Sequence, residues 1–204
     1  MSAPVVYLAS KSPRREELLR QLGVDFTALR MREASGREAD VTEGARDAEP
    51  ALHYVERIAR TKAAIGWQRM QQRGLPPRPV LGADTEVVLD GVIFGQPKDA
   101  ADAARMLAAL SNRSHHVLTA VAFCWEQQIV AEISTSSVTF RELKRDEIER
   151  YIATGEPFDK AGAYAVQGRA ASFVTRIEGS YSGVMGLPLY ETAVALAAIG
   201  FPVL

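Results

Sequence analysis

The first residues that could take part in chemistry lie near the start of the chain. A short apolar segment, residues 5–8, is followed by Ser12, Pro13, Arg14 and Arg15 after a polar turn. Ser12 and Pro13 are typical of the N-cap and the first position of a helix, so both arginines fall in its first turn. Added cations are favourable there only beside an anion. The pattern indicates either a phosphate site or two arginines that point into water and pair with the glutamates that follow.

Asp84 is the best candidate for a catalytic carboxylate. It follows the apolar residues 80–83, which predict a buried strand. Ligand sites in sheets with parallel strands lie at strand ends, so we expect Asp84 to end this strand beside a site. There it could bind Mg²⁺ or take a proton from an attacking water. The alternative is an aspartate that only caps the strand.

A glycine-rich segment, residues 155–168, carries a second group of polar residues. Asp159 and Lys160 are adjacent, and Gln167 lies near the end of the segment. Glycines let the backbone approach a ligand closely. The carboxylate and the ammonium could serve a metal and a phosphate, or form a surface ion pair of little energetic value. Gln167 offers a donor and an acceptor, which suits the reading of a base edge.

The apolar pattern predicts the elements that must position these residues. A charged stretch, residues 32–49, is predicted to be a mobile loop or insertion, and Asp90 with Gly91 is a strong hairpin signal. Strands and helices in mixed order indicate an α/β (mixed α+β) fold around one mixed sheet. Strands are expected at residues 5–8, 26–29, 80–83, 86–89, 92–94, 117–125, 129–140, 173–177 and 182–185, and helices at 13–22, 50–72, 100–110, 144–153 and 188–199.

Composition limits the class of protein and its partners. The 204 residues suffice for one domain or two closely packed lobes, and the net charge of −1 argues against broad nucleic-acid or membrane-surface binding. Cys124 is the only cysteine, so no intramolecular disulfide can form. No apolar run reaches the ~20 residues of a membrane span. The N-terminus lacks a signal-peptide pattern, so we expect a cytoplasmic protein.

Several other kinds of site are disfavoured by the absence of their motifs. The sequence has no Walker loop, no G-x-G-x-x-G and no G-x-S-x-G. His53, His115 and His116 lack metal-ligand spacing, and we expect the last two to open a strand.

Read in order, several segments resemble the Maf family of nucleoside triphosphate pyrophosphatases. They are residues 8–19, 82–85, 97–99, 106–107, 110–111, 155–168 and 184–189. The resemblance implies one Maf-like domain over residues 1–204, with an inosine-triphosphatase-like fold of two lobes about a cleft. It also implies a house-cleaning hydrolase that cleaves a nucleoside triphosphate between the α- and β-phosphates. The products would be a monophosphate and pyrophosphate, and the cofactor a divalent cation such as Mg²⁺, Mn²⁺ or Co²⁺.

The same resemblance assigns roles to individual residues. Asp84 matches the general base, and the positions linked to base selection are Arg14, Thr85 and Gln167. Other matching cleft residues are Ser10, Arg15, Lys62, Asp159 and Lys160, and the implied metal ligands are Asp84, Asp159 and Glu33.

The details of these motifs resemble the branch of the family that acts on dTTP and UTP. One departure is Gln96, where the family usually has lysine; a glutamine can only hydrogen-bond a phosphate, and Lys98 could help. The alternatives are an enzyme acting on 7-methyl-GTP or a modified pyrimidine triphosphate, and a nucleotide sensor in cell division. The resemblance further suggests a homodimer, with no nucleic-acid polymer or membrane as partner.

Overall fold

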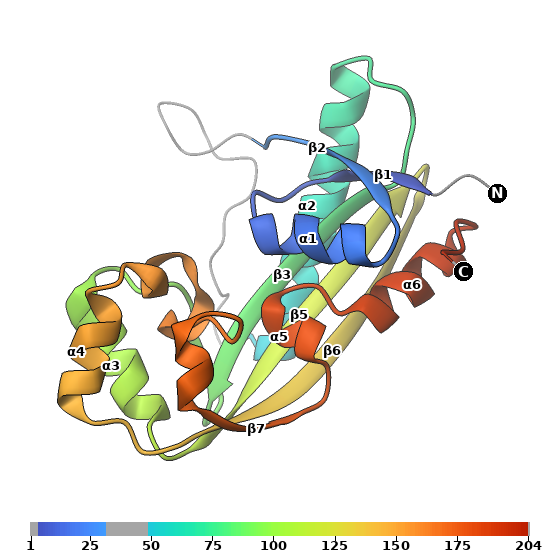
Figure 1. Cartoon of the computed structure of the whole chain (residues 1–204). Coiled ribbons are helices and arrows are strands. Elements are labelled where there is room, and N and C mark those ends of the chain that lie inside the picture. Colours follow the sequence, from blue (N-terminus) through green and yellow to red (C-terminus); the bar gives the residue numbers. More distant parts are fainter. Residues whose placement is uncertain (1–3, 32–48, 204) are drawn as a thin grey trace.

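The structure of the chain is a computed structural model that describes residues 4–31 and 49–203. Within these ranges, seven strands form one mixed sheet in the order β2-β1-β3-β5-β6-β7, with β4 paired to β3 (Figure 1). The predicted mixed α/β fold is confirmed. The strands are β1 (Val5–Leu8), β2 (Asp25–Ala28), β3 (Val80–Leu89), β4 (Val92–Phe94), β5 (Ser114–Trp125), β6 (Gln128–Phe140) and β7 (Val174–Glu178).

Helices cover both faces of this sheet (Figure 1). These are α2 (Ala51–Gln72) on one face and α1 (Pro13–Gln21), α5 (Tyr181–Met185) and α6 (Leu189–Ala198) on the other. The remaining two, α3 (Ala100–Leu110) and α4 (Arg145–Ile152), lie together at the end of the long strands (Figure 1). Alternation along β5 explains the two layers, because successive side chains point to opposite faces. Ala120 and Ala122 pack with α2, whereas Val121 and Phe123 pack with α1 and α6.

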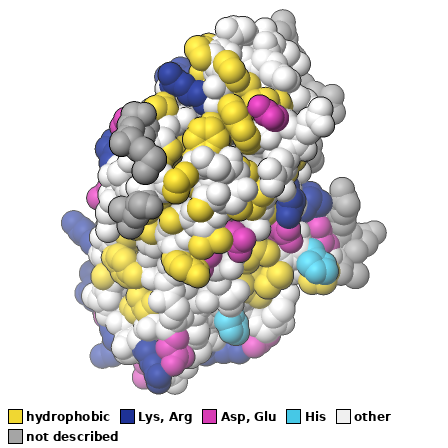
Figure 2. All heavy atoms as spheres, turned by 90° about the vertical axis from the view of Figure 1, so that its right-hand side faces the viewer, with side chains coloured by type: hydrophobic (Ala, Val, Ile, Leu, Met, Phe, Trp, Pro, Cys, Tyr) yellow, Lys and Arg dark blue, Asp and Glu magenta, His cyan; other side chains and the backbone are white. Residues whose placement is uncertain are grey.

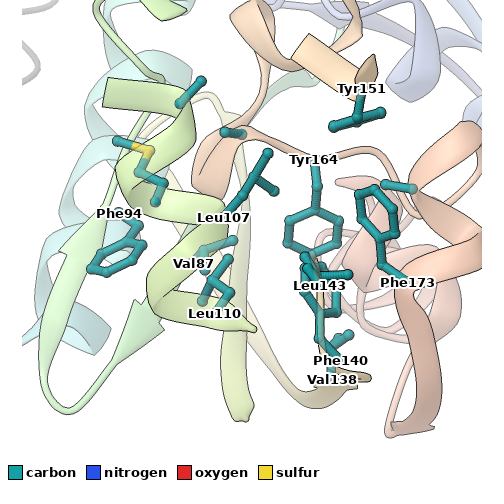
Figure 3. Close-up of a cluster of buried hydrophobic side chains, with 14 of the residues drawn as sticks. Val87, Phe94, Leu107, Leu110, Val138, Phe140, Leu143, Tyr151, Tyr164 and Phe173 are labelled. Atoms are coloured by element: carbon teal, nitrogen blue, oxygen red, sulfur yellow. The ribbon is translucent and has the colours of Figure 1, made fainter. Parts of the chain in front are cut away.

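α3 and α4 lie at the same end of the long strands (Figure 1). A further hydrophobic cluster packs these helices against that end of the sheet. Phe140, Tyr164 and Phe173 form edge-to-face ring pairs in it, with ring centroids 4.8 Å and 6.0 Å apart. Figure 3 shows Leu107 and Leu110 of α3 directed toward the same cluster. This apolar cluster anchors the segment that follows α4. It therefore also fixes the position of Asp159, Lys160 and Gln167, which this segment carries.

The central strand β3 has a different neighbour at each end of one edge. Its first two residues pair with β1 in parallel, and its last three pair with β4 in an antiparallel hairpin. Its other edge pairs with β5 throughout. In the described chain, residues 82–86 therefore have no strand beside them on the edge between β1 and β4. The sheet is open there, at its middle.

The hairpin between β3 and β4 forms where it was predicted. Asp90 and Gly91 have φ of 52° and 79°, and Leu89 pairs with Val92 across the turn. Two residues with positive φ give the turn type whose twist matches the flanking strands.

The separate strands predicted at residues 80–83 and 86–89 are wrong, because β3 is one strand. Asp84 and Glu86 lie inside it, and the pairing of β3 with β5 runs without a break from Val80 to Val88. The polar residues do not end the strand because this backbone ladder continues past them. Asp84 therefore lies in the middle of β3 and not at its end.

The strand predicted at residues 182–185 is also wrong, because this segment forms the short helix α5. Ser180 caps the helix by accepting a hydrogen bond from the Gly183 N–H at 2.9 Å, and Gly186 ends it with a φ of 118°. A capping serine and a C-terminal glycine outweigh the strand preference of the valine between them.

Two sequence predictions fall on parts of the chain that are not described. They are the mobile loop at residues 32–49 and the metal ligand Glu33; residues 32–48, which include Glu33, lie outside the described residues.

None of the helices in the described part is both long enough and apolar enough to cross a membrane.

Candidate active site

A cleft of about 740 Å³ lies at the open middle of the sheet. Its walls come from the end of β1, the first turn of α1, the exposed edge of β3, the residues after β4, and the loop after α4. The structure brings together in this cleft every predicted site residue that it describes: Ser10, Arg14, Arg15, Lys62, Asp84, Thr85, Asp159, Lys160 and Gln167.

Asp84 is held from the α2 side of the sheet. The residue is 6% exposed, and its Oδ1 accepts a hydrogen bond from Lys62 Nζ at 2.9 Å. Its Oδ2 is buried and has no hydrogen-bond partner among the residues that the structure describes. The lysine therefore orients the carboxylate and leaves its second oxygen available to a ligand, a proton or a cation.

Gly82 explains how α2 comes near enough for this contact. A Cβ atom at Gly82 would lie 2.3 Å from the backbone oxygen of Ala59 and 2.5 Å from the nitrogen of Ala63. Only a residue without a side chain lets the backbone of α2 lie this close to β3. Lys62, in the same turn of the helix, can then reach Asp84.

Glu86 is a cleft residue that sequence reasoning missed. It is 9% exposed, lines the cleft and lies two residues after Asp84 in β3. Side chains two apart along a strand point to the same face. This spacing could have identified Glu86, had residues 80–89 been predicted as one strand.

Arg15 connects three elements at the edge of the cleft. Its Nη1 donates to Ser10 Oγ at 3.0 Å, its Nε to the Gly186 backbone oxygen at 2.8 Å, and its Nη2 to Thr85 Oγ1 at 3.2 Å. The interpretation in which Arg15 points into water is therefore wrong. Its guanidinium fixes α1 and α5 against β3.

Arg14 faces the opposite wall of the cleft. Its Nη1 lies 3.8 Å from Asp159 Oδ2, whereas Glu16 accepts from Arg20. The first turn of α1 thus presents a cation across the cleft to the loop after α4. The positive end of the helix dipole and the charge of the arginines both favour the binding of an anion at this point.

Asp159 and Lys160 interact directly within this loop. Lys160 Nζ donates to the Asp159 carboxylate and, at 3.2 Å, to the backbone oxygen of Glu156. Burial raises the pKa of Asp159, but the hydrogen bond and charge of Lys160, with the charge of Arg14, outweigh it and leave the pKa below its ordinary value. Asp159 is therefore an ionised carboxylate at neutral pH, already engaged with two cations.

Gln96 stands at the place where the resemblance expects a lysine. It lines the cleft, and its Nε2 donates to the backbone oxygen of Asp159 at 3.4 Å. Lys98 is exposed and does not line the cleft, so the structure does not support it as a substitute for the lysine.

Two tyrosines hold the loop that carries these residues. Tyr151 Oη donates to Glu156 Oε1 at 2.9 Å and accepts from the Ala165 N–H at 3.3 Å. Tyr164 Oη lies 2.8 Å from Nε2 of His115, which is 1% exposed. Burial lowers the pKa of His115 to about 4, so this histidine is neutral at pH 7. As predicted, it lies at the start of a strand.

The cleft offers few ligands to a divalent cation. Among the described residues, 4–31 and 49–203, there is no group of three or more acidic, histidine or cysteine side chains that could hold a metal. However, the buried Asp84 Oδ2 is an oxygen ligand of the kind that Mg²⁺ prefers, and Mg²⁺ sites on nucleotides often use only one or two carboxylates with the phosphates. Asp84 fits the cation, whereas Asp159 is occupied by Lys160 and Arg14.

The buried pair of Asp84 and Lys62 and the arginine-bearing N-terminus of α1 line one cleft over the gap in the mixed sheet. Such an arrangement suits a phosphorylated ligand. The chain belongs to the Maf family, because the family model described as Maf-like protein matches residues 5–199.

Similar proteins include two bacterial relatives. The chain is 55% identical to a dTTP/UTP pyrophosphatase of Aromatoleum aromaticum, over 97% of this chain and 96% of the relative. It is 52% identical to a dTTP/UTP pyrophosphatase of Nitrosomonas europaea, over the same shares. Among solved structures, the Staphylococcus aureus Ham1 protein matches with a TM-score of 0.43 and 13% identity, over 67% of this chain and 71% of that one.

Proposed function

We propose that this protein hydrolyses dTTP and UTP to the nucleoside monophosphate and pyrophosphate. The observation that carries the proposal is the Asp84 carboxylate, which Lys62 holds by one oxygen while the other is buried without a partner in the described chain. Relatives about half identical over almost the whole chain carry the name dTTP/UTP pyrophosphatase. A cleft of about 740 Å³ is also of the size that small-molecule ligands occupy.

The residues of the cleft have two tasks, which are to bind the triphosphate and to activate a water molecule. Arg14 and the N-terminal N–H groups of α1 bind the triphosphate, because both favour an anion at the same point. Asp84 orients a water molecule and takes its proton as it attacks phosphorus. Lys62 keeps the carboxylate in place. Most of the acceleration comes from positioning and from charge neutralisation, as is usual in phosphoryl chemistry.

A divalent cation, Mg²⁺ or else Mn²⁺ or Co²⁺, is part of the proposal. Asp84 would hold it, with Glu86 on the same face of β3 as a second carboxylate. Such a cation would neutralise phosphate charge and polarise the P–O bonds. Because its ligands are so few, we expect the substrate phosphates to supply the remaining ones, and chelation with EDTA to stop turnover reversibly.

The deciding experiment measures pyrophosphate release with Mg²⁺ from dTTP, UTP, CTP, GTP, ATP and 7-methyl-GTP. Release from dTTP and UTP, with the monophosphate as the other product, is the expected result. Release from 7-methyl-GTP alone would keep the chemistry and replace the substrate. Binding without release from any nucleotide would replace the enzyme by a nucleotide sensor, with Gln96 as the first residue to change to lysine.

We also propose that the protein forms a homodimer through the face that carries α5 and α6. Tyr181, Tyr190 and Val194 are 50%, 77% and 38% exposed on these helices. Figure 2, which views the molecule from the α6 side, shows hydrophobic side chains gathered on this face. Exposed apolar patches of this kind mark interaction surfaces. Light scattering should give twice the chain mass, and Tyr190→Lys should shift it toward the monomer; a monomeric parent protein would contradict the proposal.

A further inference from the structure

The turn that carries Gln167 is held at both ends by a tyrosine and a glutamate. Tyr151 Oη accepts a hydrogen bond from the Ala165 N–H at 3.3 Å, two residues before Gln167. Glu156 Oε2 accepts one from the Arg169 N–H at 3.2 Å, two residues after it. Tyr151 Oη also donates to Glu156 Oε1 at 2.9 Å. The tyrosine, the carboxylate and the turn therefore form one closed network of hydrogen bonds.

Gly168 brings the carboxylate of Glu156 against this turn. A Cβ at Gly168 would lie 2.2 Å from Oε1 and 2.7 Å from Oε2 of Glu156, so only a residue without a side chain leaves room for the carboxylate. The Gly168 N–H donates to the Ala165 backbone oxygen at 3.0 Å, which closes the turn. Tyr151 and Glu156 are not among the described residues that line the cleft. They fix the backbone on either side of Gln167 without facing a ligand.

Gln167 offers the cleft a side chain that matches the edge of uracil and thymine. It is exposed and lines the cleft, and its amide has one acceptor oxygen and two N–H donors. The edge of uracil or thymine presents its N3–H donor between two carbonyl oxygens, so the amide can accept from the N3–H and donate to a neighbouring oxygen. Both bonds form together only at one placement of the amide, and that placement depends on the backbone of Gln167.

We propose that Tyr151 and Glu156 are positioning residues that hold Gln167 in place to bind the base of the nucleotide. They act through the backbone of residues 165–169 and do not touch the substrate. Groups that are fixed before the ligand arrives lower the ordering cost of binding. The inference rests on the proposed function and specifies which residues fix its contact with the base. The phosphates bind elsewhere, at Arg14 and the N-terminus of α1, so the two parts of the nucleotide can be measured separately.

The test is Tyr151→Phe, which keeps the ring beside Phe173, with the ring centroids 5.2 Å apart in the parent protein, and removes the hydroxyl. The Ala165 N–H and Glu156 Oε1 then lose this partner. We expect the Kd for UTP, measured by calorimetry in EDTA, to rise about fivefold, the effect of one hydrogen bond. The Kd for inorganic triphosphate, which has no base, should stay at the parent value. An unchanged Kd for UTP, or an equal rise for both ligands, would overturn the proposal.

Glu156→Gln reaches the same contact by a second route and decides the matter if Tyr151→Phe does not fold. The carboxylate accepts from two donors, the Tyr151 O–H and the Arg169 N–H, whereas an amide has only one acceptor oxygen. One end of the turn is therefore released, and the Kd for UTP should rise as it does in Tyr151→Phe. The two changes together should raise it little more than either alone, because both break the same network.

Gln167→Ala shows whether the effect passes through Gln167. It should raise the Kd for UTP about tenfold and leave the Kd for inorganic triphosphate unchanged. In the Gln167→Ala background, Tyr151→Phe should change the Kd for UTP by less than about twofold, because no amide is left to position. A further fivefold rise in the double variant would overturn the proposal, and so would a Gln167→Ala protein with the parent Kd for UTP.

Tyr7→Phe and Glu147→Gln are the matched controls. Tyr7 is also buried, and its hydroxyl donates to the Pro76 backbone oxygen at 3.2 Å. Glu147 also accepts from a side chain, that of Arg141 at 2.8 Å, and from a backbone N–H, that of Lys144 at 3.1 Å. Both variants lose comparable hydrogen bonds away from the turn, so the Kd for UTP should stay at the parent value. A fivefold rise in either would overturn the proposal, because general stability would then explain the effect.

Calorimetry measures binding alone, so its result does not depend on hydrolysis. A protein that releases no pyrophosphate but shows these changes in the Kd for UTP would overturn the proposed hydrolysis and support the roles of Tyr151 and Glu156. A protein that releases pyrophosphate from UTP, and whose Kd for UTP does not respond to Tyr151→Phe or Glu156→Gln, would keep the hydrolysis and overturn these roles.

Discussion

At the scale of single residues, the proposed mechanism depends first on Asp84 as general base. Asp84→Asn keeps the size of the side chain and a partner for Lys62, but an amide cannot take a proton from water. We expect turnover of dTTP and UTP to fall by about 10²–10⁴, the usual contribution of a general base, with UTP binding largely kept. Pyrophosphate release and calorimetry measure the two effects separately.

Asp90→Asn is the control for that variant. Asp90 lies in the turn at the end of the same strand, where its carboxylate is exposed and pairs with Arg113 at 2.7 Å. Asparagine is well suited to a positive φ, so the fold is preserved. Activity should stay at the parent value. An Asp84→Asn protein as active as Asp90→Asn would remove Asp84 from the mechanism.

The residues that touch the cleft were largely predictable, and those behind them were not. Asp84, Arg14 and Gln167 stand out as polar side chains beside apolar segments or glycines. Thr119, whose hydroxyl donates to Thr85 behind the cleft, has the sequence context of an ordinary strand residue. Its contact with Thr85 depends on the register of β5 with β3, and register is not visible in a local pattern.

At the scale of elements, the contact of α2 with β3 depends on Gly82. In Gly82→Ala the new Cβ would lie within 2.5 Å of the α2 backbone, so the helix must move away from the sheet. We expect a loss of about 1–3 kcal/mol in the free energy of unfolding, the usual cost of overpacking. Activity should fall as well, because Lys62 moves with the helix. Urea unfolding and pyrophosphate release report the two losses.

Gly95→Ala provides the comparison for stability. An added Cβ at Gly95 meets nothing within 4 Å, and its backbone is not in the left-handed region. The free energy of unfolding should change by no more than about 0.5 kcal/mol, as is usual for open sites. If Gly82→Ala unfolds at the same urea concentration as Gly95→Ala, the close approach of α2 is not required for stability.

Element types were predictable wherever the apolar pattern was long. The helix expected at residues 50–72 is α2 almost to the residue, since its inner stripe spans several turns. The helix α5 has only five residues, and its identity is set by the bond from Gly183 to Ser180 and by the sheet beneath it. A segment this short gives no periodicity to read.

At the scale of the whole molecule, His115 makes stability depend on pH. The unfolded histidine takes up a proton near its ordinary pKa of 6.5, whereas burial lowers the pKa in the folded protein to about 4. The unfolded state therefore binds more protons between these values, and the free energy of unfolding falls as the pH falls from 6.5 to 4. The loss should be on the order of 3 kcal/mol, measured by urea unfolding at several pH values.

His115→Gln should remove most of this pH dependence, because the amide can face Tyr164 and does not titrate. His116→Gln is the control, since His116 is the next residue of β5 and its side chain is exposed. It should keep the slope of the parent protein. The same slope in all three proteins would assign the pH dependence to other groups.

The family resemblance implied a cleft, but the pattern of residues could not show where it would lie. It exists because β3 pairs with β1 at one end and with β4 at the other, which leaves residues 82–86 without a strand beside them in the described sheet. Strand order and pairing partners are properties of the assembled sheet. From the apolar pattern, the mixture of strands and helices was evident, but the order of the strands was not.

The same arrangement has a mechanical consequence. β3, β5 and β6 run without interruption from the part of the sheet beside α1 to the part beside α3, so both walls of the cleft are built on one continuous ribbon. The walls can separate only if this ribbon bends or twists, which deforms many ladder hydrogen bonds slightly and breaks none. The stiffness of β3, β5 and β6 therefore sets the width of the cleft.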